Sequence, residues 1–154
     1  MYKAHILSLM GSSGKSGKHG ENRSGDLSWG LPRAERRPIL LVDDDAAIRE
    51  VLTLALKLHG YEVDAVQNYV EAREKLASGR YISILLDVVL PDISGIFFYH
   101  RLKALRPDLA RRVIFLTGAK DLCSQLGDLR REGRPVLFKP ARIPEVLEAL
   151  QAFD

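Results

Sequence analysis

Ile82-Ser83-Ile84-Leu85-Leu86-Asp87, followed by the turn-rich stretch 88–95, predicts a strand that is buried on both faces. An apolar run of this length between turn residues is typical of a parallel strand covered by helices. Its last residue, Asp87, places a carboxylate at the carboxyl end of the strand, where open α/β sheets bind their ligands. The stretch Ile39-Leu40-Leu41-Val42 also ends in acids, Asp43-Asp44-Asp45. The two stretches together predict a site at one edge of a parallel sheet.

The remaining folded part alternates between strands and helices. Asp45 and Asn68 are predicted N-caps, with Glu71 as a capping-box partner of Asn68, and glycines follow the expected helix ends. We expect helices over 46–59, 68–76, 94–105, 122–131 and 143–153, and strands over 39–42, 61–66, 82–87, 113–117 and 136–139. Five strand–helix units predict an α/β fold, a doubly wound (βα)5 parallel sheet with helices on both faces. A closed barrel would need eight such units.

Composition divides the chain into two parts. Of its 154 residues, 46% are hydrophobic, which suffices for one domain with a full core, predicted over 38–154. Residues 1–37 are predicted to be a flexible, basic, Gly/Ser-rich N-terminal extension. They hold seven Lys/Arg against three Asp/Glu, whereas residues 38–154 hold sixteen against seventeen. Because the charges of the extension are scattered, we expect no direct DNA binding and no membrane contact.

The sequence lacks the features of a nucleotide-binding loop, of a disulfide-bonded protein and of a membrane span. Gly14-Lys15-Ser16 resembles the end of a phosphate-binding loop, but the required earlier glycine is Leu9, and glycines follow where a helix should begin. A single cysteine, Cys123, cannot form an internal disulfide, which fits a reducing cytoplasm. No run of about 18 apolar residues is present. The sequence therefore favours a cytoplasmic domain without a membrane span.

Four of the expected strands end in polar residues that should meet at one edge of the sheet. These are the acids Asp43 and Asp44, the carboxylate Asp87, the hydroxyl of Thr117 and the ammonium of Lys139. Several carboxylates at short range repel one another unless a cation intervenes. Oxygen ligands of this kind suit Mg²⁺. A metal, a carboxylate, a hydroxyl and a lysine together indicate phosphoryl transfer.

Each residue then has an expected role. Asp87 is the predicted phosphoacceptor and a metal ligand, Asp44 a direct ligand, and Asp43 a ligand acting through water or from the second shell. The backbone carbonyl of Val89 could complete the protein ligands. Thr117 is expected to donate to a phosphoryl oxygen, and Lys139 to pair with Asp87 before the reaction and with phosphate after it.

Four motifs in this order resemble the response-regulator receiver domain of two-component systems: Ile39 to Asp45, Leu85-Leu86-Asp87 with Leu90-Pro91-Asp92 and Gly95, Phe115-Leu116-Thr117-Gly118-Ala119, and Phe138-Lys139-Pro140. The resemblance covers about residues 38–154. It implies a flavodoxin-like strand order 2-1-3-4-5 and a cis bond before Pro140. It also implies a signalling domain in a phosphorelay, not a classical enzyme, although it promotes its own phosphorylation and dephosphorylation.

The resemblance further implies partners. A histidine kinase or a histidine phosphotransfer protein would donate the phosphoryl group, and an unknown downstream protein would bind a face formed by about residues 122–153. The chain ends after the fifth helix, so we expect it to act by protein contact. The family usually carries an aromatic switch residue three positions before the lysine. That position is Val136, so the usual Thr–aromatic coupling is not expected.

Two alternatives remain open. A pseudo-receiver would bind partners without phosphorylation, and the full set of site residues argues against it. A haloacid-dehalogenase-like phosphatase would use Asp43 as nucleophile and Asp45 as acid/base, but it needs a further acidic pair after Lys139 and a cap insertion. Asp45 is more simply a helix N-cap, and Asp92 and Gly95 are more simply turn residues.

Overall fold

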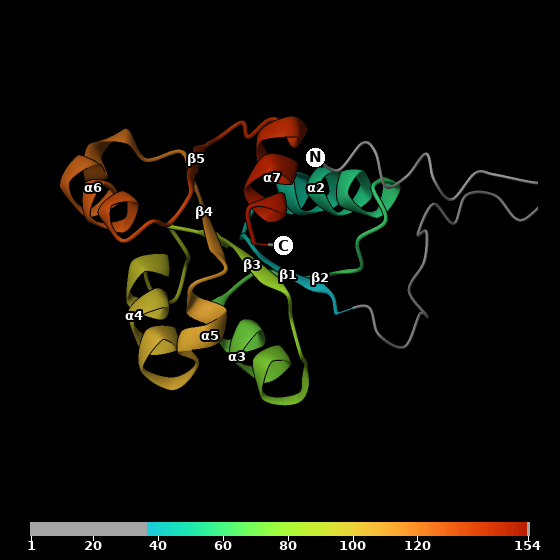
Figure 1. Ribbon diagram of the computed structural model, residues 1–154, viewed down its shortest axis with the longest axis horizontal. Helices are drawn as coiled ribbons and strands as arrows, with labels where there is room; N and C mark the ends of the chain where they lie inside the picture. Colours follow the sequence, from blue (N-terminus) through green and yellow to red (C-terminus); the bar gives the residue numbers. More distant parts are fainter. Residues whose placement is uncertain (1–36, 154) are drawn as a thin grey trace, which may run out of the picture.

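A computed structural model gives the structure of residues 37–153. The chain forms a five-stranded, wholly parallel sheet in the order β2-β1-β3-β4-β5, as predicted (Figure 1). The central strands are buried on both faces, which explains their continuous apolar sequence. The strands are β1 (Ile39–Val42), β2 (Val63–Val66), β3 (Ser83–Asp87), β4 (Val113–Thr117) and β5 (Val136–Phe138).

Helices cover both faces of this sheet, so the fold has three layers (Figure 1). On one face, α2 and α7 bury Leu52, Leu56 and Val146 against β1, β3 and β4. On the other, Phe98, Tyr99 and further apolar side chains of α3, α4, α5 and α6 form the second core. The helices are α2 (Ala46–Leu58), α3 (Tyr69–Ser78), α4 (Gly95–Leu105), α5 (Pro107–Ala110), α6 (Cys123–Arg131) and α7 (Ile143–Gln151).

The helices begin and end at the residues that the sequence marks. The Asp45 carboxylate accepts hydrogen bonds from the N–H groups of Ala47 and Ile48 at the start of α2. Asn68 caps α3 by accepting from the N–H of Glu71. Glu71 departs from the expected capping box, because its carboxylate accepts from the N–H of Gln67, one residue before the cap. After α2 and α6, Gly60 and Gly133 have positive φ angles, which glycine adopts without strain.

Two short elements were not predicted from the sequence. The chain after Leu105 forms the four-residue helix α5, which begins at Pro107 because proline suits the first turn of a helix. A single 3₁₀ turn, η2 (Lys120–Leu122), precedes α6. The strand β2 begins at Val63, not at residue 61, since Tyr61 and Glu62 lie before the ladder with β1. The predicted extension lies outside the described residues, apart from Arg37.

Among residues 37–153, no helix has both the length and the apolar character that crossing a membrane requires.

Candidate functional site

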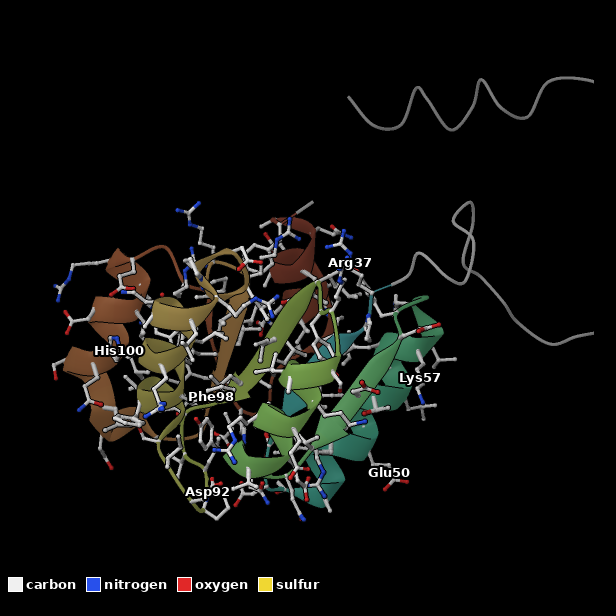
Figure 2. The ribbon with its side chains drawn as sticks, turned by 90° about the horizontal axis from the view of Figure 1, so that it is seen from below. Arg37, Glu50, Lys57, Asp92, Phe98 and His100 are labelled. Atoms are coloured by element: carbon white, nitrogen blue, oxygen red, sulfur yellow. The ribbon has the colours of Figure 1, made fainter. Side chains whose placement is uncertain are left out.

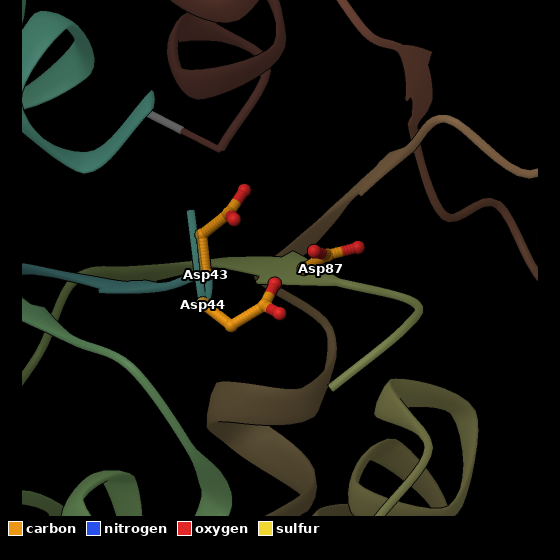
Figure 3. Close-up of side chains that lie close together, drawn as sticks. All are labelled: Asp43, Asp44 and Asp87. Atoms are coloured by element: carbon orange, nitrogen blue, oxygen red, sulfur yellow. The ribbon is translucent and has the colours of Figure 1, made fainter. Parts of the chain in front are cut away.

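The predicted acidic residues converge at the carboxyl edge of the sheet. Asp43 follows β1 and Asp87 ends β3, and both are buried, whereas Asp44 is exposed. One carboxylate oxygen from each of the three lies within 4.8 Å of the others (Figure 3). The pairing of β1 with β3 causes this, because Val42 lies opposite Leu86 and the next residue of each strand is an aspartate. The buried apolar residues of both strands hold the register in place.

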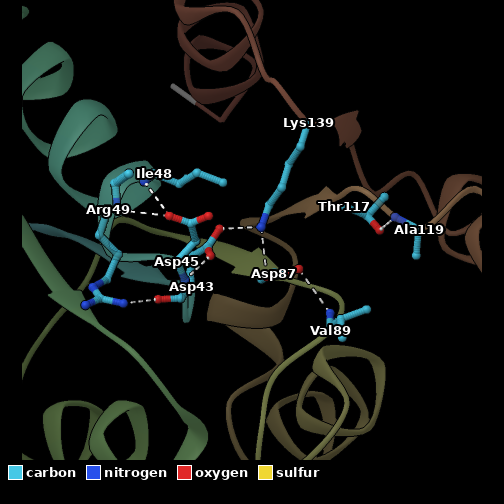
Figure 4. Close-up of polar contacts among 10 residues, drawn as sticks. Asp43, Asp45, Ile48, Arg49, Asp87, Val89, Thr117, Ala119 and Lys139 are labelled. Atoms are coloured by element: carbon cyan, nitrogen blue, oxygen red, sulfur yellow. Dashed lines mark hydrogen bonds and ion pairs between the residues drawn. The ribbon is translucent and has the colours of Figure 1, made fainter.

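Lys139, which follows β5, supplies a cation to this acidic site. Its Nζ lies 2.6 Å from Asp43 Oδ2 and 2.8 Å from Asp87 Oδ2 (Figure 4). The contact with Asp87 has hydrogen-bond geometry. The contact with Asp43 is a close ion pair, so the Lys139 ammonium lies between two buried carboxylates. The Lys139–Pro140 bond is cis, as the family resemblance implies.

The electrostatics of the site leave negative charge uncompensated. Burial raises the pKa of Asp87 above its ordinary value, although the hydrogen bonds from Lys139 and from the Val89 N–H oppose this shift; the nearby Asp43 carboxylate raises it further. Desolvation would lower the pKa of Lys139, but the carboxylates of Asp43 and Asp87 outweigh it and raise that pKa. One ammonium thus faces three carboxylates, which favours binding of a second cation.

The donor set fits a hard divalent cation. Carboxylate oxygens are the ligands that Mg²⁺ prefers, and it is usually held by one or two of them together with waters and phosphate oxygens. Asp43 and Asp87 are buried here, and Asp44 is exposed to solvent at the same place. Asp43, Asp44 and Asp87 could therefore hold Mg²⁺ without rearrangement of the strands.

The other predicted residues lie at the same edge. Thr117 ends β4, the strand beside β3, and its hydroxyl oxygen accepts a hydrogen bond from the N–H of Ala119 at 3.0 Å. The N–H of Val89 donates to Asp87 Oδ1 at 3.0 Å. Val136 is buried in the core beside α6, and the exposed aromatic of β5 is Phe138, which lies opposite Thr117 in the ladder.

Three residues at or near the site make contacts that the sequence did not predict. The Arg49 guanidinium donates to the backbone carbonyl of Asp43 at 2.7 Å, which fixes the loop after β1 (Figure 4). The Asp92 carboxylate accepts from the N–H groups of Tyr69 and Val70 and so caps α3 from a distant loop. A side chain at Gly95 would overlap the backbone carbonyl of Asp87. Only Gly95 had a local signal, because a glycine in a turn marks a close approach of backbone.

Comparison with known proteins agrees with this architecture. Residues 39–151 match the family model described as the response regulator receiver domain. The chain is 32% identical over 114 residues to the response regulator MprA of Mycobacterium sp. strain KMS, and 33% identical over the same length to MprA of Mycobacterium ulcerans. These matches cover 74% of this chain and 49% and 48% of the two relatives. The chain therefore spans about half the length of the curated relatives it matches.

Solved structures show the same fold. A CheY-like receiver domain protein from Methanospirillum hungatei has 28% identity and a TM-score of 0.68, over 77% of this chain and 93% of that one. The response regulator TrrA from Thermotoga maritima, solved in complex with Mg²⁺ and BeF, has 31% identity and a TM-score of 0.66, over 77% of this chain and 99% of that one. The chain belongs to the response regulator receiver domain family of two-component systems.

Proposed function

We propose that this protein accepts a phosphoryl group on Asp87 with the help of Mg²⁺ and passes the signal on through contact with other proteins. The observation that carries the proposal is the convergence of Asp43, Asp44 and Asp87 around one point, with the Lys139 ammonium between two of them. A buried carboxylate is suited to attack phosphorus when nearby cations, here an ammonium and a metal ion, neutralise its charge and can then pair with the phosphoryl oxygens.

The residues would act in a defined order. A carboxylate oxygen of Asp87 attacks the phosphorus of a phosphohistidine in line, and the P–N bond breaks as the new P–O bond forms. The electron pair of the broken bond leaves with the imidazole, which takes a proton. Lys139 neutralises Asp87 beforehand and is then free to pair with a phosphoryl oxygen. The Thr117 hydroxyl, now bonded to Ala119, can turn to donate to another phosphoryl oxygen.

Mg²⁺ would be held by Asp44, Asp87 and the backbone carbonyl of Val89, with Asp44 as a direct ligand and Asp43 acting through water or from the second shell. When bound, it neutralises charge that develops on the phosphoryl oxygens. The Mg²⁺–BeF complex of the TrrA structure supports this choice of metal, since that receiver has the same fold.

The donor would be a histidine kinase or a histidine phosphotransfer protein. A groove of about 420 Å³ lies beside Lys139, lined mostly by apolar residues of α2 and of the loop after β5. Val51, Leu54 and Leu58 extend this apolar surface along α2, and each is more than 60% exposed. Exposed apolar residues next to a reactive carboxylate indicate a protein-binding surface. We therefore place the donor on α2.

The downstream partner would contact the face formed by about residues 122–153, which includes α6, β5 and α7. Thr117 and Lys139 connect this face to the site, because the N–H of Lys139 donates to the Thr117 carbonyl at 2.8 Å. Val136 carries no ring that could move, so the signal is expected to depend on the loop between Thr117 and α6. In this role the protein is a signalling domain and catalyses only its own phosphorylation and dephosphorylation.

Two alternatives predict different behaviour. A pseudo-receiver would bind its partner equally well with Asp87 replaced and without a phosphodonor. A haloacid-dehalogenase-like phosphatase would need Asp45 as acid/base, yet the Asp45 carboxylate accepts two N–H groups at the start of α2. That capping role counts against the phosphatase.

The deciding experiment is incubation with acetyl phosphate and Mg²⁺, followed by intact-mass measurement. The wild type is expected to gain about 80 Da, one phosphoryl group, and to lose this gain when Mg²⁺ is chelated. Asp87→Asn should show no gain. Asp121→Asn, an exposed acid in η2 outside the proposed site, is the matched control and should be labelled like the wild type. Labelling that persists in Asp87→Asn would refute the assignment of the phosphoacceptor.

A further inference from the structure

The amino edge of the sheet, opposite the acidic site, carries a row of arginines. In a parallel sheet all strands begin at the same edge, and here four adjacent strands begin just after an arginine. They follow the sheet order β1, β3, β4, β5. The arginines are Arg37 before β1, Arg80 before β3, Arg111 and Arg112 before β4, and Arg134 before β5. Figure 2 shows Arg37 at the end of the sheet away from Asp92 and Glu50.

The charge of this row is not matched by acids. Within residues 37–153, none of the five arginines forms an ion pair with a carboxylate. Arg112 and Arg134 donate instead to backbone carbonyls, which leaves their positive charge in place. Arg37, Arg80 and Arg111 are exposed.

Two carboxylates near this edge form ion pairs with residues outside the row. Asp108 pairs with Arg106, and Glu132 pairs with Lys103. Glu62 precedes β2, and its backbone carbonyl accepts the N–H of Ile39 at 2.8 Å, so it lies beside the β1 end of the row. Among the described residues it forms no ion pair with an arginine of the row, which therefore presents unpaired positive charge.

The spacing and the residue type indicate what would bind there. Neighbouring strands lie about 4.8 Å apart, so the row extends over about 14 Å. One strand of a nucleic acid places a phosphate about every 3.4 Å along a duplex, so about four phosphates match this length. All five cations are arginines, whose planar fork binds phosphate through two hydrogen bonds. Evenly spaced arginines fit the evenly spaced phosphates of a nucleic acid better than they fit the unevenly spaced carboxylates of an acidic protein.

We propose that this arginine row binds the sugar–phosphate backbone of a nucleic acid without reading its base sequence. The sequence analysis expected no direct DNA binding, because the charges of the N-terminal extension are scattered. Folding brings the arginines that precede the four strands into one line. This proposal is independent of phosphorylation at Asp87.

The test is fluorescence anisotropy of the full chain with a labelled DNA duplex of roughly 20 base pairs, titrated at several salt concentrations. If four phosphates are neutralised, log K should fall with log[salt] with a slope of about −3.6. Affinity should then drop about 150-fold between about 50 and 200 mM salt. Binding that is absent at about 50 mM salt would overturn the proposal.

A charge-matched pair of variants localises the binding. The triple variant Arg37→Gln, Arg80→Gln and Arg111→Gln removes the three exposed arginines of the row and should reduce the salt slope by about 2.7. The control Arg73→Gln, Arg101→Gln and Arg142→Gln removes three exposed arginines elsewhere and should leave the slope unchanged. Circular dichroism melting verifies that both variants fold. Equal losses in the two variants would mean that only net charge matters and would overturn the proposal.

Two competitors identify the ligand. Polyglutamate at the same charge concentration should compete poorly with the duplex, because it lacks phosphates. Phosphatidylglycerol vesicles should also compete poorly. Competition by either that is as strong as by unlabelled duplex would show an acidic-protein or membrane surface instead, and would overturn the assignment to nucleic acid.

Discussion

The two edges of the sheet carry opposite charge and arrange it in opposite ways. At the carboxyl edge, the carboxylates of Asp43, Asp44 and Asp87 converge on one point, and two of them, Asp43 and Asp87, pair with the Lys139 ammonium. At the amino edge, the arginines lie side by side along four strands and no carboxylate is paired with them among the described residues. A convergent cluster can hold one small ion or group, whereas a row can only follow an extended ligand. We therefore expect each residue of the acidic site to be decisive and the arginines to act additively.

After the complete loss of labelling in Asp87→Asn, the largest effect is expected from Asp43→Asn. The amide cannot serve as a carboxylate ligand, so Mg²⁺-dependent labelling by acetyl phosphate should slow by about 100-fold. Without Mg²⁺ the same variant should be as stable as the wild type or more stable by about 1 kcal/mol, because one buried carboxylate facing Asp87 is removed. The rate of labelling measures the first effect. Urea denaturation in the presence of a metal chelator measures the second.

At the opposite edge the corresponding single change should be mild. Arg80→Gln is expected to reduce the salt slope of duplex binding by only about 0.9. Two results together would contradict this comparison of the two edges. They are loss of all binding in Arg80→Gln and unchanged labelling in Asp43→Asn.

The next largest effect is expected from Gly95→Ala. The added Cβ would overlap the carbonyl of Asp87, so the free energy of unfolding should fall by about 1–3 kcal/mol. Gly127→Ala is the matched control, because a Cβ there meets no atom within 4 Å and the residue lies inside α6. That control should gain about 0.5–1 kcal/mol. Guanidinium denaturation compares the two, and equal effects would contradict a close approach at Gly95.

A smaller effect is expected from the apolar surface beside the acidic site. The double variant Val51→Asp and Leu54→Asp should slow transfer from a phosphohistidine protein by about tenfold, while labelling by acetyl phosphate stays unchanged. Leu105→Asp is the control, since Leu105 is 74% exposed at the end of α4, near the amino edge. A variant that slowed both reactions equally would place α2 in the chemistry and not in donor binding.

The smallest effect concerns Glu132. Hydrogen bonds from Lys103 and then from Tyr99 lower the pKa of Glu132 below 4.5. A carboxylate with a lowered folded-state pKa stabilises the fold above its unfolded pKa, and this contribution is lost as pH falls through the folded pKa. Because the side chain is 36% exposed, the contribution should not exceed about 0.5 kcal/mol. Glu132→Gln should thus be less stable than the wild type at pH 7 by that amount, and the difference should vanish in acid.

The strands, their parallel arrangement and the acidic site could all be predicted from the sequence. Continuous apolar strands are stable when helices cover both faces of the sheet, and each of these strands ends in, or is followed by, a polar residue. Parallel strands bring their ends to one edge, so Asp43, Asp87, Thr117 and Lys139 could be placed together without coordinates. Local caps such as Asp45 were readable for the same reason, because their partners lie within three residues.

Contacts between residues that are far apart in the sequence could be found only in the tertiary structure. The contact of Arg49 with the carbonyl of Asp43, the capping of α3 by Asp92 and the need for glycine at position 95 depend on how loops from different units pack. The arginine row also arises this way, since residues up to 97 positions apart become neighbours once strand order is fixed. Hydrophobic periodicity and helix caps involve residues that are close in the sequence. The distribution of charge along an edge of the sheet depends on the order of all its strands.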